Sequence, residues 1–405
     1  MPRVGVLARY GSLLRLPGMA PAVAASTLGR VSMGTSSLAI LLLIRQATGS
    51  YAAAGTVTAA YSLSFALTAP ILARWADRTG PRPVLRACGV GQPLALVTLV
   101  VLVRGHAALV LLAAGAAAVG ALTPPLGSVM RALWGQLTEG RDAVAAYALE
   151  SILVELCFTI GPLLVAGLTV LGGPGAAVLA SAALAGIGGL LLAAVPRIRD
   201  VVPHPDRSGV GLVGPLASPR VRALLLTILC VGAGFGVIEV AVPAFLQQHG
   251  GRPAGAGVLL AVWSVGSIAG GLAYGAMRPR RPPARQITLL AALLATGMAL
   301  PVLADTSLLL GCLLFVYGTT IAPYSACNSY LLGDAAAAGT QTEVFAWNGT
   351  MIFGGAAAGN AASGYLVQHH GATMAFALAA GFGAVALVLS FAGRAAIRAP
   401  APVRP

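Results

Sequence analysis

Long apolar runs, separated by short polar connections, recur along the whole chain. A helix needs about 20 mostly apolar residues to cross the hydrocarbon core of a bilayer. The pattern predicts twelve membrane-spanning helices. We place them at residues 20–44, 52–74, 84–103, 107–132, 143–171, 175–195, 221–246, 254–277, 286–304, 307–332, 342–367 and 372–393.

The second half of the chain repeats features of the first half. A shift of 202 residues places Gly34 on Gly236, and a shift of 198 places Gly161 on Gly359. This is the pattern of a parallel repeat of six helices. The longest connection lies between the two halves and is rich in Pro, Arg and Asp. We therefore expect an N-terminal bundle at 1–195, a linker loop at 196–220 and a C-terminal bundle at 221–405.

Composition excludes a soluble protein. The chain is 58% hydrophobic and 9% charged, whereas soluble domains are about 25% charged. Most of the surface must therefore face lipid. The net charge of +14 comes from 25 arginines without any lysine. Such a balance can indicate nucleic-acid binding, but no segment could form a soluble basic domain, so we expect no nucleic-acid partner.

The arginines instead indicate how the chain is oriented in the membrane. Arg45, Arg104 and Arg252 fall on one side of the predicted helices and Arg30 falls inside one; all the others lie on the side of the N-terminus. Arginine gathers in cytoplasmic loops, so both termini are expected in the cytoplasm. Arginine without lysine, together with abundant Ala and Gly, is typical of a GC-rich bacterial genome. We therefore expect a multi-pass protein of the bacterial cytoplasmic membrane.

A charged turn between the second and third predicted helices is the most distinctive motif. Residues 73–82 read ARWADRTGPR and contain Asp77-Arg78-x-Gly80, followed by Arg82. The turn resembles the loop between helices 2 and 3 of the major facilitator superfamily, although Ala73 and Pro81 replace a Gly and an Arg of that pattern. With the helix count, the orientation and the repeat, the resemblance covers the whole chain. It implies an all-α fold of twelve transmembrane helices in two six-helix bundles.

The resemblance also implies a role for the motif. In this family the aspartate meets the N-terminal end of helix 11 and an arginine of helix 4 while the cytoplasmic side is closed. Asp77 is the matching aspartate, and Arg131 is the matching arginine. A carboxylate suits both partners, because a helix N-terminus is partly positive and guanidinium pairs with it. The alternative is a plain topology signal, to which an acidic residue would add nothing.

A charged residue well inside a membrane-spanning helix costs at least about 2.5–3.5 kcal/mol, and we consider four such residues as functional candidates. They are Arg30, Glu150, Glu155 and Glu239. Ser151, Glu155 and Thr159 are spaced to share one helix face, which the resemblance places towards the central cavity. We interpret Glu155 and Glu239 as sites of proton coupling or substrate binding. The structural alternative for Glu155 is an ion pair with Arg30. Arg30 and Glu150 are candidates for the same coupling or binding roles, and the alternative for Glu150 is an ion pair with Arg131 in the gate.

Less specific signals come from the fifth and eleventh predicted helices, at residues 143–171 and 342–367. Gly161-Pro162 resembles the start of an antiporter signature of the superfamily, but Val165 and Ala166 replace its closing glycines. A proline kink with small-residue packing is the alternative. Asn348 and Asn360 are predicted to face the cavity, or else to join helices by hydrogen bonds.

The sequence lacks the motifs of an enzyme. It contains no lysine for a nucleotide-binding loop, no metal-binding spacing within a helix and no CxxC pair among its five cysteines. We therefore expect neither a cofactor nor a metal.

Together these features predict a secondary transporter that works by alternating access. We expect proton-coupled export of a small, partly apolar organic molecule by a protein that is monomeric, as is usual in the family. The first alternative is an importer of a metabolite, sugar or amino acid. A transporter-like receptor or a membrane enzyme is a more remote alternative.

Overall fold

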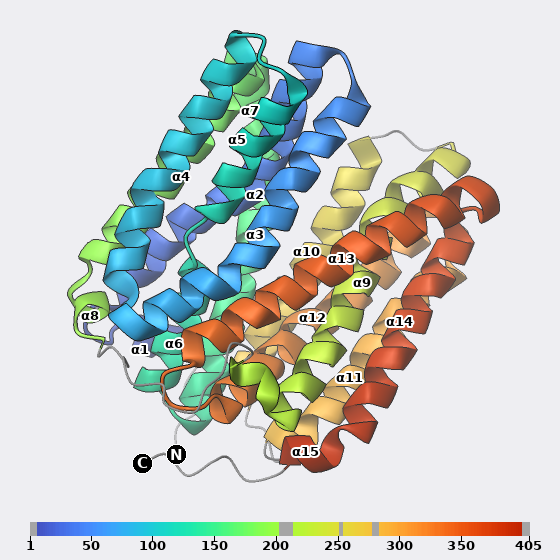
Figure 1. Cartoon of the computed structure of the whole chain (residues 1–405). Helices are drawn as coiled ribbons and strands as arrows, with labels where there is room; N and C mark the ends of the chain where they lie inside the picture. The colour runs from blue at the N-terminus through green and yellow to red at the C-terminus, as the bar shows by residue number, and fades with distance from the viewer. Residues whose placement is uncertain (1–5, 202–213, 251–253, 278–282, 399–405) are drawn as a thin grey trace.

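The computed structural model describes residues 6–201, 214–250, 254–277 and 283–398, which are almost entirely helical. Two bundles of long helices lie side by side, and both chain ends lie at the same end of the molecule (Figure 1). The first bundle consists of α2 (Met19–Thr48), α3 (Tyr51–Thr79), α4 (Pro81–Arg104), α5 (Leu109–Ala121), α6 (Leu126–Leu137) and α7 (Gly140–Ala194). The second consists of α9 (Pro219–Gln248), α10 (Ala254–Ala276), α11 (Pro283–Ala299), α12 (Ser307–Ala335), α13 (Gln341–His370) and α14 (Ala372–Ala392).

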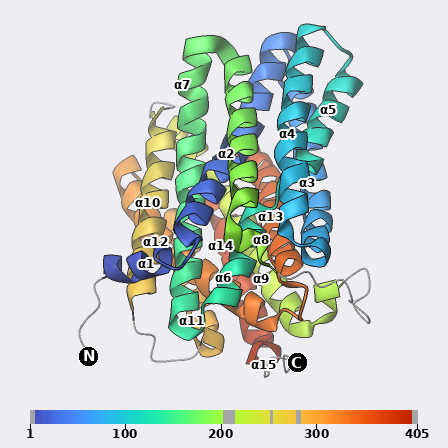
Figure 2. The same cartoon turned by 90° about the vertical axis from the view of Figure 1, so that its left-hand side faces the viewer.

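Short helices lie near the end of the molecule that holds the termini. They are α1 (Val6–Leu14), α8 (Pro196–Arg199), η1 (Gly214–Ala217) and α15 (Arg394–Arg398), and a further short helix, η2 (Leu300–Leu303), continues α11. Figure 2 shows α1 lying across the long axes of the bundles. The centre of the expected linker, residues 202–213, and Arg252 lie outside the described residues.

Ten helices of the described ranges are long and apolar enough to cross a membrane. One of them, α7, covers two expected segments, because the backbone leaves the helical region at Gly173 (φ 78°, ψ 172°) and turns there. Such a positive φ favours glycine. A further helix of 30 residues, α13, is not among these ten, but it packs along α9. With these two features, the structure accounts for the twelve crossing segments predicted from the sequence.

The fourth crossing segment differs from its prediction. The expected segment at 107–132 is present as a candidate span over Leu109–Leu137, but its helix is interrupted, because α5 ends at Ala121 and α6 begins at Leu126. Pro124 and Pro125 lie in the break and have no N–H group to continue the helical hydrogen bonds. Thr123 also lies in this break, and its hydroxyl accepts a hydrogen bond from the Gln92 side chain of α4 at 3.0 Å.

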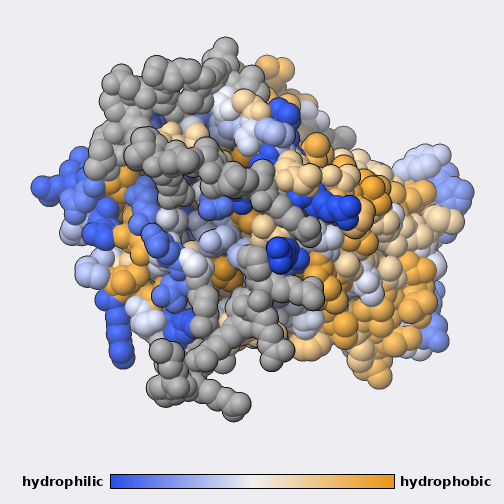
Figure 3. Space-filling view, turned by 90° about the horizontal axis from the view of Figure 1, so that it is seen from below, coloured by the Kyte–Doolittle hydropathy of each residue, from blue (hydrophilic) through white to orange (hydrophobic). Residues whose placement is uncertain are grey.

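The outer faces of the helices are apolar. Leu163, Val170 and Leu171 are 68%, 86% and 84% exposed, which suits contact with lipid chains rather than with water. The face at the termini end is different: Figure 3 shows hydrophilic residues gathered over much of it. This distribution is the one expected of helices that cross a bilayer.

Small residues let α9 and α13 approach each other closely. A side chain at Gly355 would meet the backbone of Leu229, and one at Gly359 would meet the backbone of Ala233. Packing of this kind replaces the hydrophobic effect as the force between helices in lipid. A side chain at Gly161 of α7 would likewise meet the backbone of Gly34 of α2. Both bundles therefore contain a pair of helices that pack closely at glycines.

Two adjacent glycines of α13 give a test of this packing. We expect Gly355→Ala to lower the free energy of unfolding by about 1–3 kcal/mol, because the added methyl group overlaps a neighbouring helix. Gly354→Ala should have little effect, since a Cβ there meets nothing within 4 Å. Thermal unfolding of the two purified variants in detergent measures the difference. Equal losses in both would contradict the close contact between α9 and α13.

Candidate functional site

Asp77 joins the two bundles at the termini end. Its carboxylate accepts hydrogen bonds from the backbone N–H groups of Thr342 at 3.1 Å and Glu343 at 3.0 Å. Both groups belong to the first turn of α13, where the helix dipole favours a negative charge. The structure thus places Asp77 of α3 at the N-terminus of the eleventh crossing segment, which is where the family resemblance puts it.

A salt bridge beside this contact was not anticipated from the sequence. The guanidinium of Arg74 donates from Nε to Glu343 Oε2 at 3.1 Å and from a terminal nitrogen to Oε1 at 3.0 Å. Glu343 is only 2% exposed, and two-point pairing of this kind is strong and directional. The sequence does show Glu343 in the first turn of the helix predicted at 342–367, but nothing in the sequence links Glu343 to Arg74.

The remaining residues of the motif shape the turn or face outward. Gly80 ends α3 with φ 84°, a conformation that favours glycine. Arg78 is exposed and Arg82 is half-buried. Arg131, the expected partner of Asp77, lines a cavity between the bundles instead and interacts electrostatically with Glu150 and Arg30. The hydrogen bonds described for Asp77 come from the first turn of α13, and a pair between Asp77 and Arg131 is not among the described contacts.

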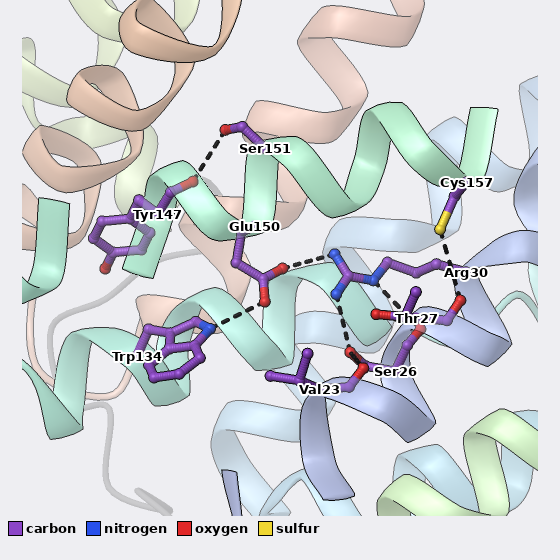
Figure 4. A network of polar contacts seen from close by, with 9 residues as sticks. All are labelled: Val23, Ser26, Thr27, Arg30, Trp134, Tyr147, Glu150, Ser151 and Cys157. Atoms are coloured by element: carbon purple, nitrogen blue, oxygen red, sulfur yellow. Dashed lines mark hydrogen bonds and ion pairs between the residues drawn. The ribbon is translucent and has the colours of Figure 1, made fainter. Parts of the chain in front are cut away.

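A buried ion pair joins α2 to α7 (Figure 4). The guanidinium of Arg30 lies 2.6 Å from Glu150 Oε2, and the two side chains are 3% and 0% exposed. Arg30 also donates to the Ser26 hydroxyl at 2.9 Å, and the indole N–H of Trp134 donates to the other Glu150 oxygen at 3.0 Å. Buried charges need partners of this kind. The sequence had left the partner of Arg30 open, and the structure assigns Glu150.

A cavity of about 130 Å³ lies next to this pair, between the bundles. Its lining combines two arginines, an asparagine and several aromatic rings. From α7 it is lined by Val154, Cys157 and Phe158. Glu155 is not among its lining residues, so the orientation of the Ser151–Glu155–Thr159 face towards the central cavity stays a prediction.

Glu155 instead connects α7 of the first bundle to α10 of the second. The Ser267 hydroxyl donates a hydrogen bond to Glu155 Oε1 at 3.0 Å, and Ser264 lies nearby. Ser151 and Thr159 use their hydroxyls within α7, on the backbone oxygens of Tyr147 and Glu155. Glu155 is thus half-buried in a polar contact between the bundles.

The corresponding contact on the other side of the molecule is aromatic. The repeat offsets of 198 and 202 place Phe353 at the position of Glu155 and Phe65 at the position of Ser267. These two rings lie edge to face, with centroids 5.9 Å apart. Next to them, Thr350 donates to the backbone oxygen of Ala66 at 3.1 Å. At these two matched positions, the bundles meet through a titratable carboxylate in one case and through a pair of aromatic rings in the other.

The other candidate residues lie within single bundles. Glu239 is exposed on α9, and its carboxylate lies near Asn360 on α13. Asn348 accepts a hydrogen bond from Asn328 at 2.9 Å and lines the cavity. Pro162 continues α7 without leaving the helical region, and the turn in this helix lies at Gly173.

The part of the chain that the structure describes holds no group of three or more potential metal ligands. All five cysteines lie in it and are free. We therefore identify the polar contacts between the bundles and the neighbouring cavity as the candidate functional site.

Comparisons with known proteins agree with this architecture. Residues 22–359 match the family model of the major facilitator superfamily. The human organic anion transporter MFSD10 is similar in structure, with a TM-score of 0.71, 18% identity, and coverage of 91% of this chain and 99% of that one. An outward-facing bacterial homologue of the iron transporter ferroportin has a TM-score of 0.76, 12% identity, and coverage of 94% and 100%.

The E. coli fucose:proton symporter is similar to the same degree, with a TM-score of 0.72, 13% identity, and coverage of 92% of this chain and 98% of that one. None of the curated proteins is a significant match to the sequence. At these identities the solved structures support the fold, while the match over 22–359 establishes the family. The chain belongs to the major facilitator superfamily and is a multi-pass membrane transporter of the secondary kind, not an enzyme.

Proposed function

We propose that this protein exports a small organic molecule in exchange for protons. The observation that carries the proposal is the Glu155 contact, in which a carboxylate of one bundle accepts a hydrogen bond from Ser267 of the other. Alternating access requires the bundles to move relative to each other around a central site. A contact between them that a proton can alter is therefore suited to coupling.

The arrangement of the bundles supports alternating access. Asp77 and Arg74 hold the bundles together at the termini end, whereas the opposite ends of the helices diverge (Figure 1). Arginines gather at the termini end, as in cytoplasmic loops. With both termini in the cytoplasm of a bacterial cell, this conformation is closed inside and faces outward.

Export is favoured by the sequence of α7, which contains the fifth crossing segment, and by the lining of the cavity. Gly161-Pro162 matches the start of the antiporter signature, and the cavity lining is largely apolar. Two similar structures are proton symporters, for fucose and for xylose. They support the proton as the coupling ion. Because they are symporters, proton-driven uptake is the second candidate.

Proton flux in inverted membrane vesicles tests the proposal. A pH gradient is imposed, and a panel of organic acids, neutral compounds and amines is added while a pH-sensitive dye reports the gradient. Export coupled to protons predicts that at least one class collapses the gradient and accumulates inside the vesicles. A substrate that leaves the vesicles together with protons would instead establish uptake, and transport without any proton movement would refute the coupling.

The Asp77 contact gives a second prediction. We expect Asp77→Asn to slow transport several-fold while the protein still reaches the membrane. The amide has no charge to interact with the α13 dipole, an interaction that contributes about 0.3–2 kcal/mol, and its NH₂ group cannot accept one of the two backbone hydrogen bonds that Asp77 accepts. Transport rates normalised to membrane content measure the effect. Thr79→Ala is the control, because Thr79 is exposed two residues away. An unchanged rate in Asp77→Asn would refute the gate.

A further inference from the structure

Among the described residues, the cavity between the bundles contains a guanidinium group that takes part in no hydrogen bond or salt bridge. The charge of Arg30 is balanced by Glu150, so these two side chains form a neutral pair. The guanidinium of Arg131 lines the same cavity. In the part of the chain that the structure describes, it makes no hydrogen bond or ion pair, and its buried Nε has no acceptor. The site therefore has a net positive charge.

The polar groups around the cavity are arranged as donors. Glu150 already uses both oxygens, one for Arg30 and one for Trp134. Asn348 uses its side-chain oxygen to accept from Asn328, which leaves its NH₂ group available. An anion is the ligand that this combination fits, because guanidinium and amide N–H groups can only donate.

The rest of the lining is largely apolar and includes four aromatic rings. Phe65, Phe158, Phe345 and Phe353 line the cavity, and Phe353 lies against both Phe65 and Phe158 with ring centroids 5.9 and 6.0 Å apart. Flat apolar groups pack well against such rings. A small inorganic anion would not use these walls. The volume of about 130 Å³ is similar to that of a cavity that holds one benzene ring.

We propose that this cavity binds an organic monoanion, with its carboxylate on Arg131 and Asn348 and its apolar body among the phenylalanines. The inference deepens the proposed function and rests on it, because it names the substrate class of the same transport path. Arg30 acts as a positioning residue in this site: its pairing with Glu150 removes the carboxylate as a competitor for Arg131.

Equilibrium binding to the purified full-length protein in detergent tests the proposal. The probes are benzoate and 2-naphthoate, the matched neutral amides, and the matched arylmethylammonium ions. We expect at least one acid to bind at least about tenfold more tightly than its amide and its ammonium analogue, since a charge-assisted hydrogen bond contributes that much. An amide or ammonium that binds as tightly as the tighter acid would overturn the proposal, as would the absence of binding by both acids.

Substitution of Arg131 locates the site. Arg131→Gln should weaken acid binding by about tenfold to a hundredfold, while Arg131→Lys should retain part of it because the charge remains. The control is Arg104→Gln, the same change at an exposed arginine at the end of α4. Normal unfolding midpoints show that the variants are folded. Undiminished acid binding by folded Arg131→Gln would place the anion elsewhere and refute the assignment.

The binding experiment and the vesicle experiment can fail separately. Acid binding that requires Arg131, without any acid-driven proton movement, would confirm the anion site and refute proton coupling. Proton movement driven by an amine, without acid binding, would refute the anion site and leave the proposed function standing.

Discussion

Replacing Glu155 by glutamine is expected to abolish proton-coupled transport while the folded protein still reaches the membrane. Glutamine has nearly the same shape and can still accept the hydrogen bond from Ser267. It cannot bind or release a proton. Substrate-driven collapse of a pH gradient in vesicles should therefore fall to background in Glu155→Gln, with normal membrane content.

The position of Glu155 explains why the effect should be large. An ionised carboxylate only accepts hydrogen bonds, whereas the protonated acid can also donate one. A proton on Glu155 therefore changes the contact with the serines of α10, and that contact belongs to the interface across which the bundles move. Proton binding and bundle movement are then two effects on one equilibrium.

Glu239 provides the matched control for this experiment. It is also a carboxylate within a crossing helix, but its partner Asn360 belongs to the same bundle. A proton there does not directly alter a contact between bundles, so Glu239→Gln should keep proton coupling. Normal coupling in Glu155→Gln, together with its loss in Glu239→Gln, would transfer the role to Glu239.

Replacing Glu150 by glutamine is expected to have the largest effect on stability. The variant leaves the charge of Arg30 buried without its partner, at 3% exposure. Breaking a buried ion pair in this way costs about 3–5 kcal/mol. The purified variant should unfold at a much lower temperature or denaturant concentration than the wild type.

Two further variants separate charge from packing. Adding Arg30→Gln to Glu150→Gln removes both charges and should recover part of the lost stability, because no unpaired charge remains. Asp334→Asn changes a carboxylate that pairs with Arg220 at 2.7 Å but is 40% exposed. That change should cost at most about 1 kcal/mol. A small effect of Glu150→Gln, similar to that of Asp334→Asn, would contradict the assignment of Arg30–Glu150 as a structural pair.

The sequence by itself determined the membrane fold. Hydrophobic length and arginine placement act locally on each segment, so they could be read without knowing which helices touch. The motif at residues 73–82 and the half-chain repeat then indicated the family, and the family match confirmed it. The interruption within the segment expected at 107–132 was not predicted, because hydropathy is insensitive to backbone breaks such as that at Pro124 and Pro125.

Only the tertiary structure decided which charges meet. Arg30 and Glu150 are 120 positions apart, and Arg74 and Glu343 are 269 apart, so their pairing depends on the rotation and depth of whole helices. A helix face can be derived from residue spacing, but the neighbour it faces cannot. For this reason the sequence identified Glu155 and Arg131 as important residues, whereas the structure placed Glu155 between the bundles and left Arg131 unpaired in the cavity.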